Sequence, residues 1–380
     1  MKLNPFYYGE VVTGENFTDR VAEIERLTTE LCGGHNIFLI SPRRYGKTSL
    51  IINTLELIKI KGLFVFYMDL YKVASVRELL DAYAKGIVRS CKTRVEKISD
   101  FIKELFPKVR PKIILGDDGV PSIEVDISLK EKELMDSLTE ILDVPQKIAK
   151  KRKKNFVVVF DEFQEITNFD GERLEKLMRA CFQHHHNVAY LFAGSKRHLL
   201  NSMVSDPNRA FYKLGDVMNL QKVAPEEMIK FVKKQFSKVP IKIEEKTIGT
   251  VLEISENVPY NVQYLCHNLW NRCLLTKEVK EDDIDAVLDN IITEQAANYI
   301  IVWDGLSLHQ RLLLKAIIKS PEQPLFSKNF IFENELGTPG SIQKSISLLT
   351  KKNIIDVEGK EIRFNDVFFK EWINKKMISA

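Results

Sequence analysis

Cysteine is scarce in this sequence, and long hydrophobic runs are missing. The five cysteines are scattered over 380 residues, and none forms a CxxC pair. An odd, scattered set excludes a disulfide framework and a zinc ribbon, and it is typical of proteins from a reducing compartment. No segment approaches the ~20 consecutive apolar residues of a membrane span, and residues 1–4 open no apolar signal sequence. We therefore expect a cytoplasmic protein that does not contact a membrane.

The sequence also lacks an excess of either charge. Its 56 Lys and Arg residues are balanced by 52 Asp and Glu residues, for a net charge of +4. This balance argues against a protein that coats nucleic acid through charge alone. The densest basic run, at residues 150–154, follows a predicted helix and precedes a predicted strand, so solvation and the helix dipole account for it.

The first 220 residues alternate short apolar runs with helical patterns, which is typical of an α/β sheet. Four runs predict strands, at residues 36–40, 63–70, 155–160 and 188–194. Because these runs are continuously apolar, we expect a parallel sheet with both faces covered by helices. Between the second and third runs, residues 112–127 predict a β-hairpin insertion with its turn at residues 116–119.

The rest of the chain has a different character. Pro225 and the acidic residues after it indicate a helix start, and helical patterns continue to about residue 300 without a strand run. The last segment predicts two helices followed by a hairpin at residues 354–364, which is the outline of a winged helix. The sequence therefore predicts three domains: an α/β domain at 1–222, an all-α lid at 223–300 and a winged helix at 301–380.

A phosphate-binding motif follows the first predicted strand. Its residues are Ser41-Pro42-Arg43-Arg44-Tyr45-Gly46-Lys47-Thr48-Ser49. This is the P-loop pattern G-x-x-x-x-G-K-[ST], except that Ser41 replaces the first glycine. Gly46 lets backbone N–H groups converge on a phosphate, Lys47 supplies charge between the β- and γ-phosphates, and the Thr48 hydroxyl ligates Mg²⁺. We expect residues 43–49 to bind a nucleotide.

Two acids follow the third predicted strand. A P-loop requires a carboxylate from a neighbouring strand, and Asp161 and Glu162 stand where the apolar run 157–160 ends. We expect Asp161 to hold Mg²⁺ through water and Glu162 to orient and polarise the attacking water. Alone, the pair also fits a strand that enters a polar loop, but the P-loop makes a catalytic pair the stronger interpretation.

Further candidates lie at the end of the fourth predicted strand. Ser195 is the leading candidate to contact the γ-phosphate or the attacking water, and Lys196 or Arg197 could stabilise charge. Ser195 also fits a helix N-cap, which does not exclude the first role. For Arg43 and Arg44, contact with phosphate or with a neighbouring subunit and a solvated loop position are both open.

The nature of the base and the role of the winged helix follow from weaker signals. The guanine signature [NT]-K-x-D is absent, so ATP is favoured by elimination.

The predicted recognition helix exposes two lysines and no arginine, together with Gln343 and Ser347. Sequence-specific DNA-binding proteins usually contact phosphates and base edges with arginine, which this helix does not expose. DNA binding is therefore possible but less favoured than docking of the winged helix within the chain or onto a protein.

These motifs together resemble the archaeal-type ATPases of the STAND group, relatives of the AAA+ proteins that also occur in bacteria. The resemblance covers nearly the whole chain. It rests on residues 4–6, 17–20 and 23, the loop 42–50, Asp69-Leu70, Asp161-Glu162-Phe163-Gln164-Glu165, Gly194-Ser195, Asn257-Val258-Pro259-Tyr260 and the closing segment 364–372.

The resemblance implies a nucleotide-dependent switch. The N-terminal box would approach the adenine, and Pro259 would lie near the base, although Asn257 replaces the usual glycine and Val367 the usual closing proline. ATP with Mg²⁺ would lie between the core and the lid, and hydrolysis would reset the switch. An unidentified protein partner is expected, and whether the chain forms a homo-oligomer is open. A DNA-binding regulator and a scaffold that binds ATP without turnover are the competing hypotheses.

Overall fold

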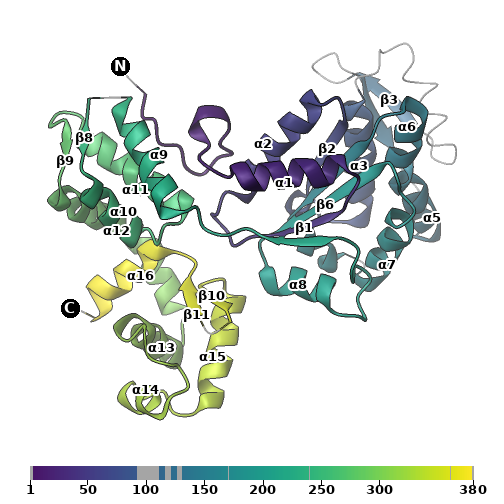
Figure 1. Ribbon diagram of the computed structural model, residues 1–380. Coiled ribbons are helices and arrows are strands. Elements are labelled where there is room, and N and C mark those ends of the chain that lie inside the picture. Colours follow the sequence, from purple (N-terminus) through teal and green to yellow (C-terminus); the bar gives the residue numbers. More distant parts are fainter. Residues whose placement is uncertain are drawn as a thin grey trace. The chain divides into compact units, whose positions relative to one another are not determined.

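The computed structural model describes residues 3–91, 111–115, 121–125, 131–169, 171–238, 240–359 and 361–378. The chain divides into two compact units (Figure 1). The sheet unit is Val11–Lys222, and the helical unit combines Met1–Glu10 with Val223–Ala380. Residues up to Glu10 thus group with the helical unit, although they were predicted to belong to the α/β domain. The three predicted domain boundaries stay predictions.

A parallel sheet forms the centre of the sheet unit. Its described strands are β1 (Ile37–Ile40), β2 (Phe64–Asp69), β5 (Phe156–Asp161), β6 (Val188–Gly194) and β7 (Asp216–Asn219). Their order is β2-β5-β6-β1-β7, and all neighbouring strands are parallel. The four predicted strands are confirmed. β7 was not predicted because it is a polar edge strand in which only Met218 is buried.

The strand order corrects one expectation about the acidic pair. From the sequence, the strand that ends at Asp161 is predicted to be the neighbour of the P-loop strand. The prediction was wrong, because β6 lies between β1 and β5 and pairs with both. Ser195, directly after β6, therefore stands between the P-loop and the acidic pair.

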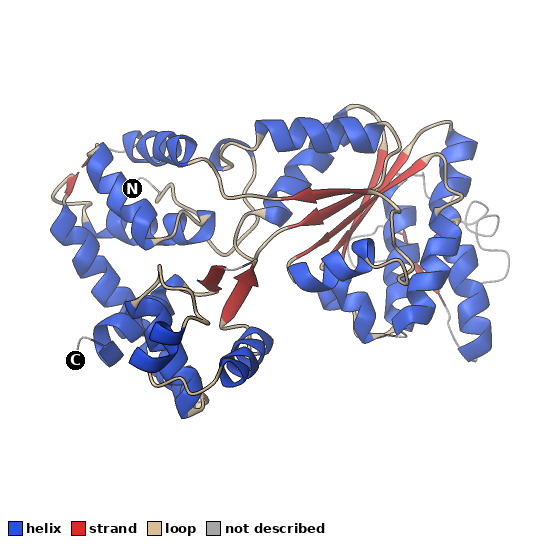
Figure 2. Ribbon diagram, turned by 60° about the horizontal axis from the view of Figure 1, so that its bottom comes forward, coloured by secondary structure: helices blue, strands red, loops and turns tan. Residues whose placement is uncertain are grey.

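Helices cover both faces of the sheet (Figure 2). In chain order they are η1 (Gly14–Asn16), α1 (Val21–Cys32), α2 (Lys47–Ile60), η2 (Leu70–Lys72), α3 (Val76–Ser90), α5 (Glu131–Leu142), α6 (Val144–Arg152), η4 (Phe163–Asn168), α7 (Gly171–Phe182) and α8 (Arg197–Ser205). Alternate strand residues such as Phe38, Phe160 and Phe192 pack with the buried residues of α3, α5, α6, α7 and α8. Every residue of β5 and β6 is buried, as expected for strands that are covered on both faces.

The predicted hairpin insertion is present between α3 and α5. It consists of β3 (Pro111–Leu115) and β4 (Pro121–Val125), which are antiparallel with Ile113 opposite Ile123. Its predicted turn at residues 116–119 lies outside the described residues, as do residues 126 and 127.

The helical unit consists mainly of helices. They are α9 (Pro225–Ser237), α10 (Glu245–Ile254), α11 (Pro259–Arg272), α12 (Glu281–Asp304), α13 (Leu308–Lys319), α14 (Lys328–Glu333), α15 (Pro339–Lys351), α16 (Val367–Ile373) and the π-helical turn η5 (Asn374–Ile378). Two short parallel strands, β8 (Lys242–Ile243) and β9 (Glu278–Val279), were not predicted. Among the described residues, no helix combines the length and apolarity that a membrane crossing requires.

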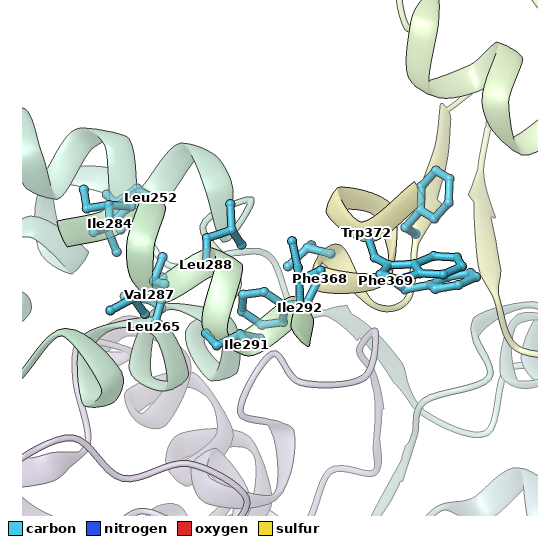
Figure 3. Close-up of a cluster of buried hydrophobic side chains, with 14 of the residues drawn as sticks. Leu252, Leu265, Ile284, Val287, Leu288, Ile291, Ile292, Phe368, Phe369 and Trp372 are labelled. Atoms are coloured by element: carbon cyan, nitrogen blue, oxygen red, sulfur yellow. The ribbon is translucent and has the colours of Figure 1, made fainter. Parts of the chain in front are cut away.

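The winged helix has the predicted outline. After α13 and α15, strands β10 (Ile355–Glu358) and β11 (Glu361–Phe364) form an antiparallel pair. One hydrophobic core runs from α9 through α16, and Figure 3 shows the part where side chains of α12 meet Phe368, Phe369 and Trp372 of α16. Because α12 continues through residue 300, no break in the helix separates the predicted lid from the predicted winged helix.

The N-terminal segment is fixed to the helical unit by specific contacts. The Phe6 ring lies 4.9 Å from that of Phe236, and Phe6 is only 1% exposed. The Asn4 side-chain amide donates to the His267 carbonyl at 3.0 Å, and the Tyr7 backbone N–H donates to Gln263 at 3.0 Å. The segment thus packs as part of this core.

Candidate nucleotide-binding and catalytic site

The P-loop connects β1 to α2 in a conformation that two residues make possible. Gly46 has φ +84° and Arg44 has φ +69°, both in the left-handed region. Gly46 accommodates this conformation because it has no Cβ, and it turns the chain directly into α2. The first backbone N–H groups of α2 lack partners within the helix, so this end is suited to bind an anion.

Ser41 fits the loop without strain although it replaces a glycine. It is buried, and it does not adopt a positive φ. Its backbone N–H donates to the Gly194 carbonyl at 3.2 Å, which ties the start of the loop to β6. The substitution therefore leaves the loop geometry intact.

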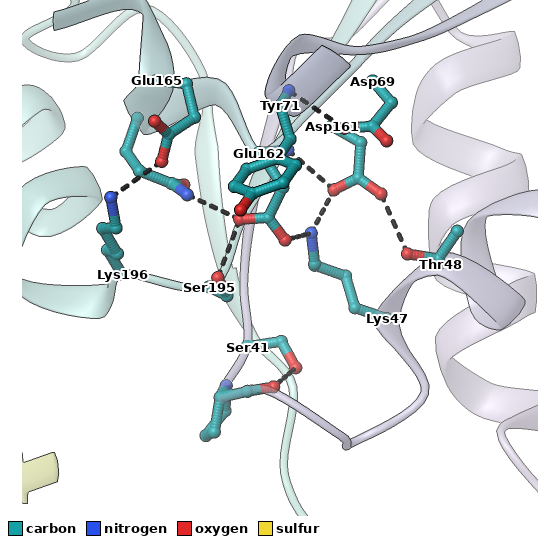
Figure 4. A network of polar contacts seen from close by, with 12 residues as sticks. Ser41, Lys47, Thr48, Asp69, Tyr71, Asp161, Glu162, Glu165, Ser195 and Lys196 are labelled. Atoms are coloured by element: carbon teal, nitrogen blue, oxygen red, sulfur yellow. Dashed lines mark hydrogen bonds and ion pairs between the residues drawn. The ribbon is translucent and has the colours of Figure 1, made fainter. Parts of the chain in front are cut away.

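Lys47 and Thr48 meet Asp161 at the carboxyl edge of the sheet (Figure 4). The Lys47 ammonium forms an ion pair with Asp161 and lies 2.8 Å from Glu162 Oε1. The Thr48 hydroxyl donates to Asp161 Oδ2 at 2.9 Å. Asp161, the last residue of β5, is 2% exposed, so its charge requires these partners.

Tyr67 also contacts Asp161, although no sequence motif predicted this contact. Its hydroxyl donates to Asp161 Oδ2 at 3.0 Å from within β2. Burial and the adjacent Asp161 carboxylate raise the pKa of Tyr67, so the hydroxyl stays protonated and remains a donor. The only sequence signal was a tyrosine two residues before Asp69 in an apolar run.

Glu162 occupies a left-handed turn directly after β5, with φ +50°. Its Oε1 faces Lys47, whereas its Oε2 accepts from Ser195 Oγ at 2.7 Å and from Gln164 Nε2 at 2.5 Å. Burial alone would raise the pKa of Glu162, but the Lys47 ammonium and these hydrogen bonds lower it to about 2. The carboxylate is therefore ionised and held at both oxygens.

The remaining candidates of the sheet unit occupy varied positions. Arg43 and Arg44 are exposed, whereas Tyr45 is buried. Ser49 Oγ accepts from the Val12 backbone N–H at 3.0 Å, so this hydroxyl holds the segment before α1. Lys196 pairs with Glu165 at 2.8 Å rather than with the acidic pair.

Arg20, directly before α1, supports the P-loop. It is 3% exposed, donates to Glu23 Oε1 at 2.6 Å and reaches the Tyr45 carbonyl at 3.4 Å. The family resemblance implies that Arg20 belongs to a segment that approaches the adenine, whereas its contact with the P-loop backbone was not predicted.

Pro259 belongs to the helical unit, where it begins α11. Asn257, two residues earlier, has φ +52°. Asparagine adopts the left-handed region more readily than most residues, which explains how it replaces the usual glycine there. The contact of Pro259 with a base stays a prediction.

The parallel sheet, the loop after β1 and the acidic pair at the end of β5 define the class of P-loop nucleoside triphosphatases. The chain belongs to the family of ATPase domains predominantly from Archaea, whose family model matches residues 17–265. A second family model, for a probable winged helix domain, matches residues 297–375. No curated protein matched the sequence.

Solved structures share this architecture at low sequence identity. A Walker-type ATPase of Pyrococcus abyssi is 17% identical with a TM-score of 0.63, over 95% of this chain and 97% of that one. The ORC2 protein of Aeropyrum pernix, solved in ADPNP–ADP complexes, is 14% identical with a TM-score of 0.56, over 96% and 97%. The ORC1 protein of the same organism, solved in complex with DNA, is 14% identical with a TM-score of 0.51, over 96% and 94%. At these identities the likeness shows the fold alone.

Proposed function

We propose that the protein binds ATP with Mg²⁺ at the P-loop, hydrolyses it and acts as a STAND-type molecular switch. The observation that carries the proposal is the convergence of Lys47, Asp161, Glu162 and Ser195 in one network at the carboxyl edge of the sheet. Membership in an ATPase family supports the choice of nucleotide.

The donor set fits Mg²⁺. The metal prefers oxygen ligands and keeps several waters, and Thr48 and Asp161 offer a hydroxyl and a carboxylate whose oxygens lie 2.9 Å apart. When bound, Mg²⁺ supplies charge neutralisation for the β- and γ-phosphates. Thr48 and Asp161 would hold it, Asp161 through water.

Lys47 would bind the phosphates, and Glu162 would act on the attacking water. In the nucleotide complex, the phosphates compete with the Asp161 and Glu162 carboxylates for the Lys47 ammonium. The ammonium then binds the phosphates as a point charge. Once Lys47 turns toward phosphate, Glu162 loses the ion pair at Oε1, and that oxygen is available to orient a water and accept its proton. Ser195 keeps Oε2 in place.

Switching would involve the helical unit. One hydrophobic core joins α9–α12 to α13–α16, so we expect residues 223–378 to respond to nucleotide as one body. Pro259 at the start of α11 is the proposed contact with the base. A protein partner, a homo-oligomer and a cytoplasmic location remain part of the proposal.

Phosphate release tests the proposal. Wild type should release phosphate from MgATP, Lys47→Ala should neither bind nor hydrolyse ATP, and Glu162→Gln should bind ATP but lose turnover by about 10²–10⁴-fold. Lys59→Ala is the matched control, since Lys59 is exposed on the same helix and pairs only with Glu56 among the described residues. Wild-type turnover no greater than that of Lys47→Ala contradicts hydrolysis. ATP binding without turnover then favours the scaffold hypothesis.

DNA binding through the winged helix is the second candidate. Gln343, Lys344, Ser347 and Lys351 are exposed on α15, and the A. pernix ORC1 protein, which shares the fold, was solved with DNA. If α15 contacts DNA phosphates, affinity for duplex DNA falls steeply with salt, and Lys344→Ala reduces the slope of log K against log salt by about 1. Absent or salt-independent binding, with and without ATP, rules this candidate out.

A further inference from the structure

Gln164 is a buried residue that contacts the proposed catalytic carboxylate. It lies in η4, two residues after Glu162, and is 1% exposed. Its Nε2 donates to Glu162 Oε2 at 2.5 Å, and Ser195 Oγ donates to the same oxygen at 2.7 Å. The other oxygen, Oε1, faces only Lys47 among the described residues. The two oxygens of Glu162 therefore have different partners.

The chemistry of the carboxylate fixes the orientation of the Gln164 amide. An ionised carboxylate only accepts hydrogen bonds, so the amide nitrogen must face Glu162 and the amide oxygen must face away. No donor among the described residues reaches that buried oxygen. A buried acceptor without a partner costs about 1–3 kcal/mol, which an apolar residue of the same size would avoid. Packing alone therefore does not explain a glutamine here.

Gly194 provides the space that the amide occupies. A Cβ at this position would lie 2.0 Å from Gln164 Oε1 and 3.2 Å from its Cδ. Gly194 does not have a positive φ, so its backbone does not require glycine. The absence of a side chain at Gly194 thus leaves the space that the Gln164 amide needs.

We propose that Gln164 is a positioning residue that, with Ser195, holds Oε2 of Glu162 so that Oε1 faces the attacking water. This inference rests on the proposed ATP hydrolysis. In that reaction the water oxygen bonds to the γ-phosphorus, the bridging P–O bond to ADP breaks, and Oε1 accepts the water proton. Lys47 leaves Oε1 for the phosphates, whereas Gln164 and Ser195 are neutral donors that stay on Oε2.

Gln164→Met tests the role, because methionine keeps the length and apolar bulk but cannot donate. We expect kcat to fall about a hundredfold, since misplacing a reacting group by ~1 Å costs about that factor, with the Kd for ATP within about threefold of wild type. Asn168→Ala is the control, because Asn168 lies in the same η4 segment but bonds to Glu165 at 2.6 Å. Its kcat should match wild type. Thermal unfolding verifies that each variant is folded.

Gly194→Ala tests the same amide from the other side. The new methyl group displaces Gln164, so kcat should fall while ATP binding persists. It also approaches Leu200 Cδ1, at 2.4 Å, so its stability is measured first. Because both changes act through one hydrogen bond, the double variant with Gln164→Met should have a kcat close to that of the lower single variant.

A carboxyl titration separates this inference from the proposed function. Loss of a donor to the charged form raises the pKa of Glu162 in Gln164→Met, and ¹³C NMR of the carboxyl without nucleotide, assigned with Glu162→Gln, measures it. If wild type hydrolyses ATP and Gln164→Met matches its kcat, the inference fails and the proposed function stands. If wild type does not hydrolyse ATP, the proposed function fails. An unchanged pKa then overturns the positioning contact, and a raised pKa supports it.

Discussion

The two units differ in what they bury. Among the described residues, every charged side chain that is buried lies in the sheet unit: Arg20, Lys47, Asp161 and Glu175. The buried polar side chains of the helical unit are all neutral: Gln235, Thr247, Ser255, Asn261, Gln263, Gln310 and Ser345. Burial of a charge costs several kcal/mol unless it is well paired. The sheet unit thus carries an electrostatic cost that the helical unit avoids.

The position of the buried charges explains why the cost is retained. Arg20 holds the P-loop backbone, and Lys47 and Asp161 form the centre of the site. Glu175 is the exception, since it pairs with Arg209 away from this network. We infer that three of the four charges serve nucleotide chemistry and that the fourth is structural. The variants below test this division.

Lys47→Met should have the largest effect. It removes the phosphate ligand, so ATP affinity falls at least about a hundredfold, and it leaves Asp161 buried without its cation, which costs about 3–5 kcal/mol of stability at pH 7. Isothermal titration and urea unfolding measure the two effects. Lys59→Met, exposed on the same helix, should match wild type in both.

The stability loss should depend on pH in a defined direction. In wild type the pKa of Glu162 lies at about 2, below its ordinary value of 4.5, so its contribution to stability is present above pH 4.5 and is lost as pH falls toward 2. In Lys47→Met the ammonium no longer lowers this pKa, so the variant loses less stability than wild type on acidification. The urea midpoints should therefore differ most at pH 7 and converge below about pH 4.5. A constant difference would show that Lys47 acts through packing.

Glu175→Gln should destabilise the sheet unit and leave the site alone. Glu175 accepts from Arg209 Nε at 3.1 Å and from a second guanidinium nitrogen, and its side chain is 2% exposed. Removing the charge leaves Arg209 without its partner, at a cost of about 2–3 kcal/mol. This cost is below that of a fully buried pair because Arg209 is partly solvated. Urea unfolding measures the loss, and a double-mutant cycle with Arg209→Met isolates the pair. If Glu175→Gln reduces kcat more than about threefold, Glu175 also serves nucleotide chemistry, and its assignment as structural is wrong.

The sequence predicted those parts of the site that follow local rules. Lys47 and Thr48 belong to one contiguous motif, and Asp161 and Glu162 end a strand that five apolar residues make unmistakable. A P-loop and an acid that follow strand ends both lie at the carboxyl edge of a parallel sheet, whatever the strand order. That is why a site at this edge was predictable although the position of β6 between β1 and β5 was not.

The missed features depend on tertiary placement. Nothing in the apolar runs specifies that β6 inserts between β1 and β5, because connection length does not fix strand order. Tyr67 reaches Asp161 only because β2 pairs with β5, and Gln164 reaches Glu162 only because that residue turns into the left-handed region. β7 is a polar edge strand without a periodic signal. Each contact is set by a neighbour that is distant in sequence or by a single backbone angle.

Arg20→Met should weaken nucleotide binding moderately. The variant keeps much of the buried bulk but loses the hydrogen bond to the Tyr45 carbonyl and the ion pair with Glu23. Hydrogen bonds from charged groups contribute about 1.5–3 kcal/mol, and the 3.4 Å contact places this one at the low end, so we expect about a tenfold rise in the Kd for ATP. Arg26→Met, in the helix that follows Arg20, is the control, since Arg26 is half-exposed and pairs with Asp216. If the Kd for ATP rises equally in Arg20→Met and Arg26→Met, Arg20 has no specific role in nucleotide binding.

Asp289→Asn, in the helical unit, should have the smallest effect. Asp289 pairs with Lys375 at 2.8 Å, but its side chain is 62% exposed. Water already solvates both charges, so we expect a loss below about 0.5 kcal/mol in urea unfolding at 0.15 M salt, and less at 1 M. Trp372→Ala, which removes a buried side chain from the same unit, should cost about 3–5 kcal/mol because it leaves a cavity. A salt-sensitive loss above about 1 kcal/mol for Asp289→Asn would mean that charge pairing also stabilises the helical unit, and the contrast between the two units would not hold.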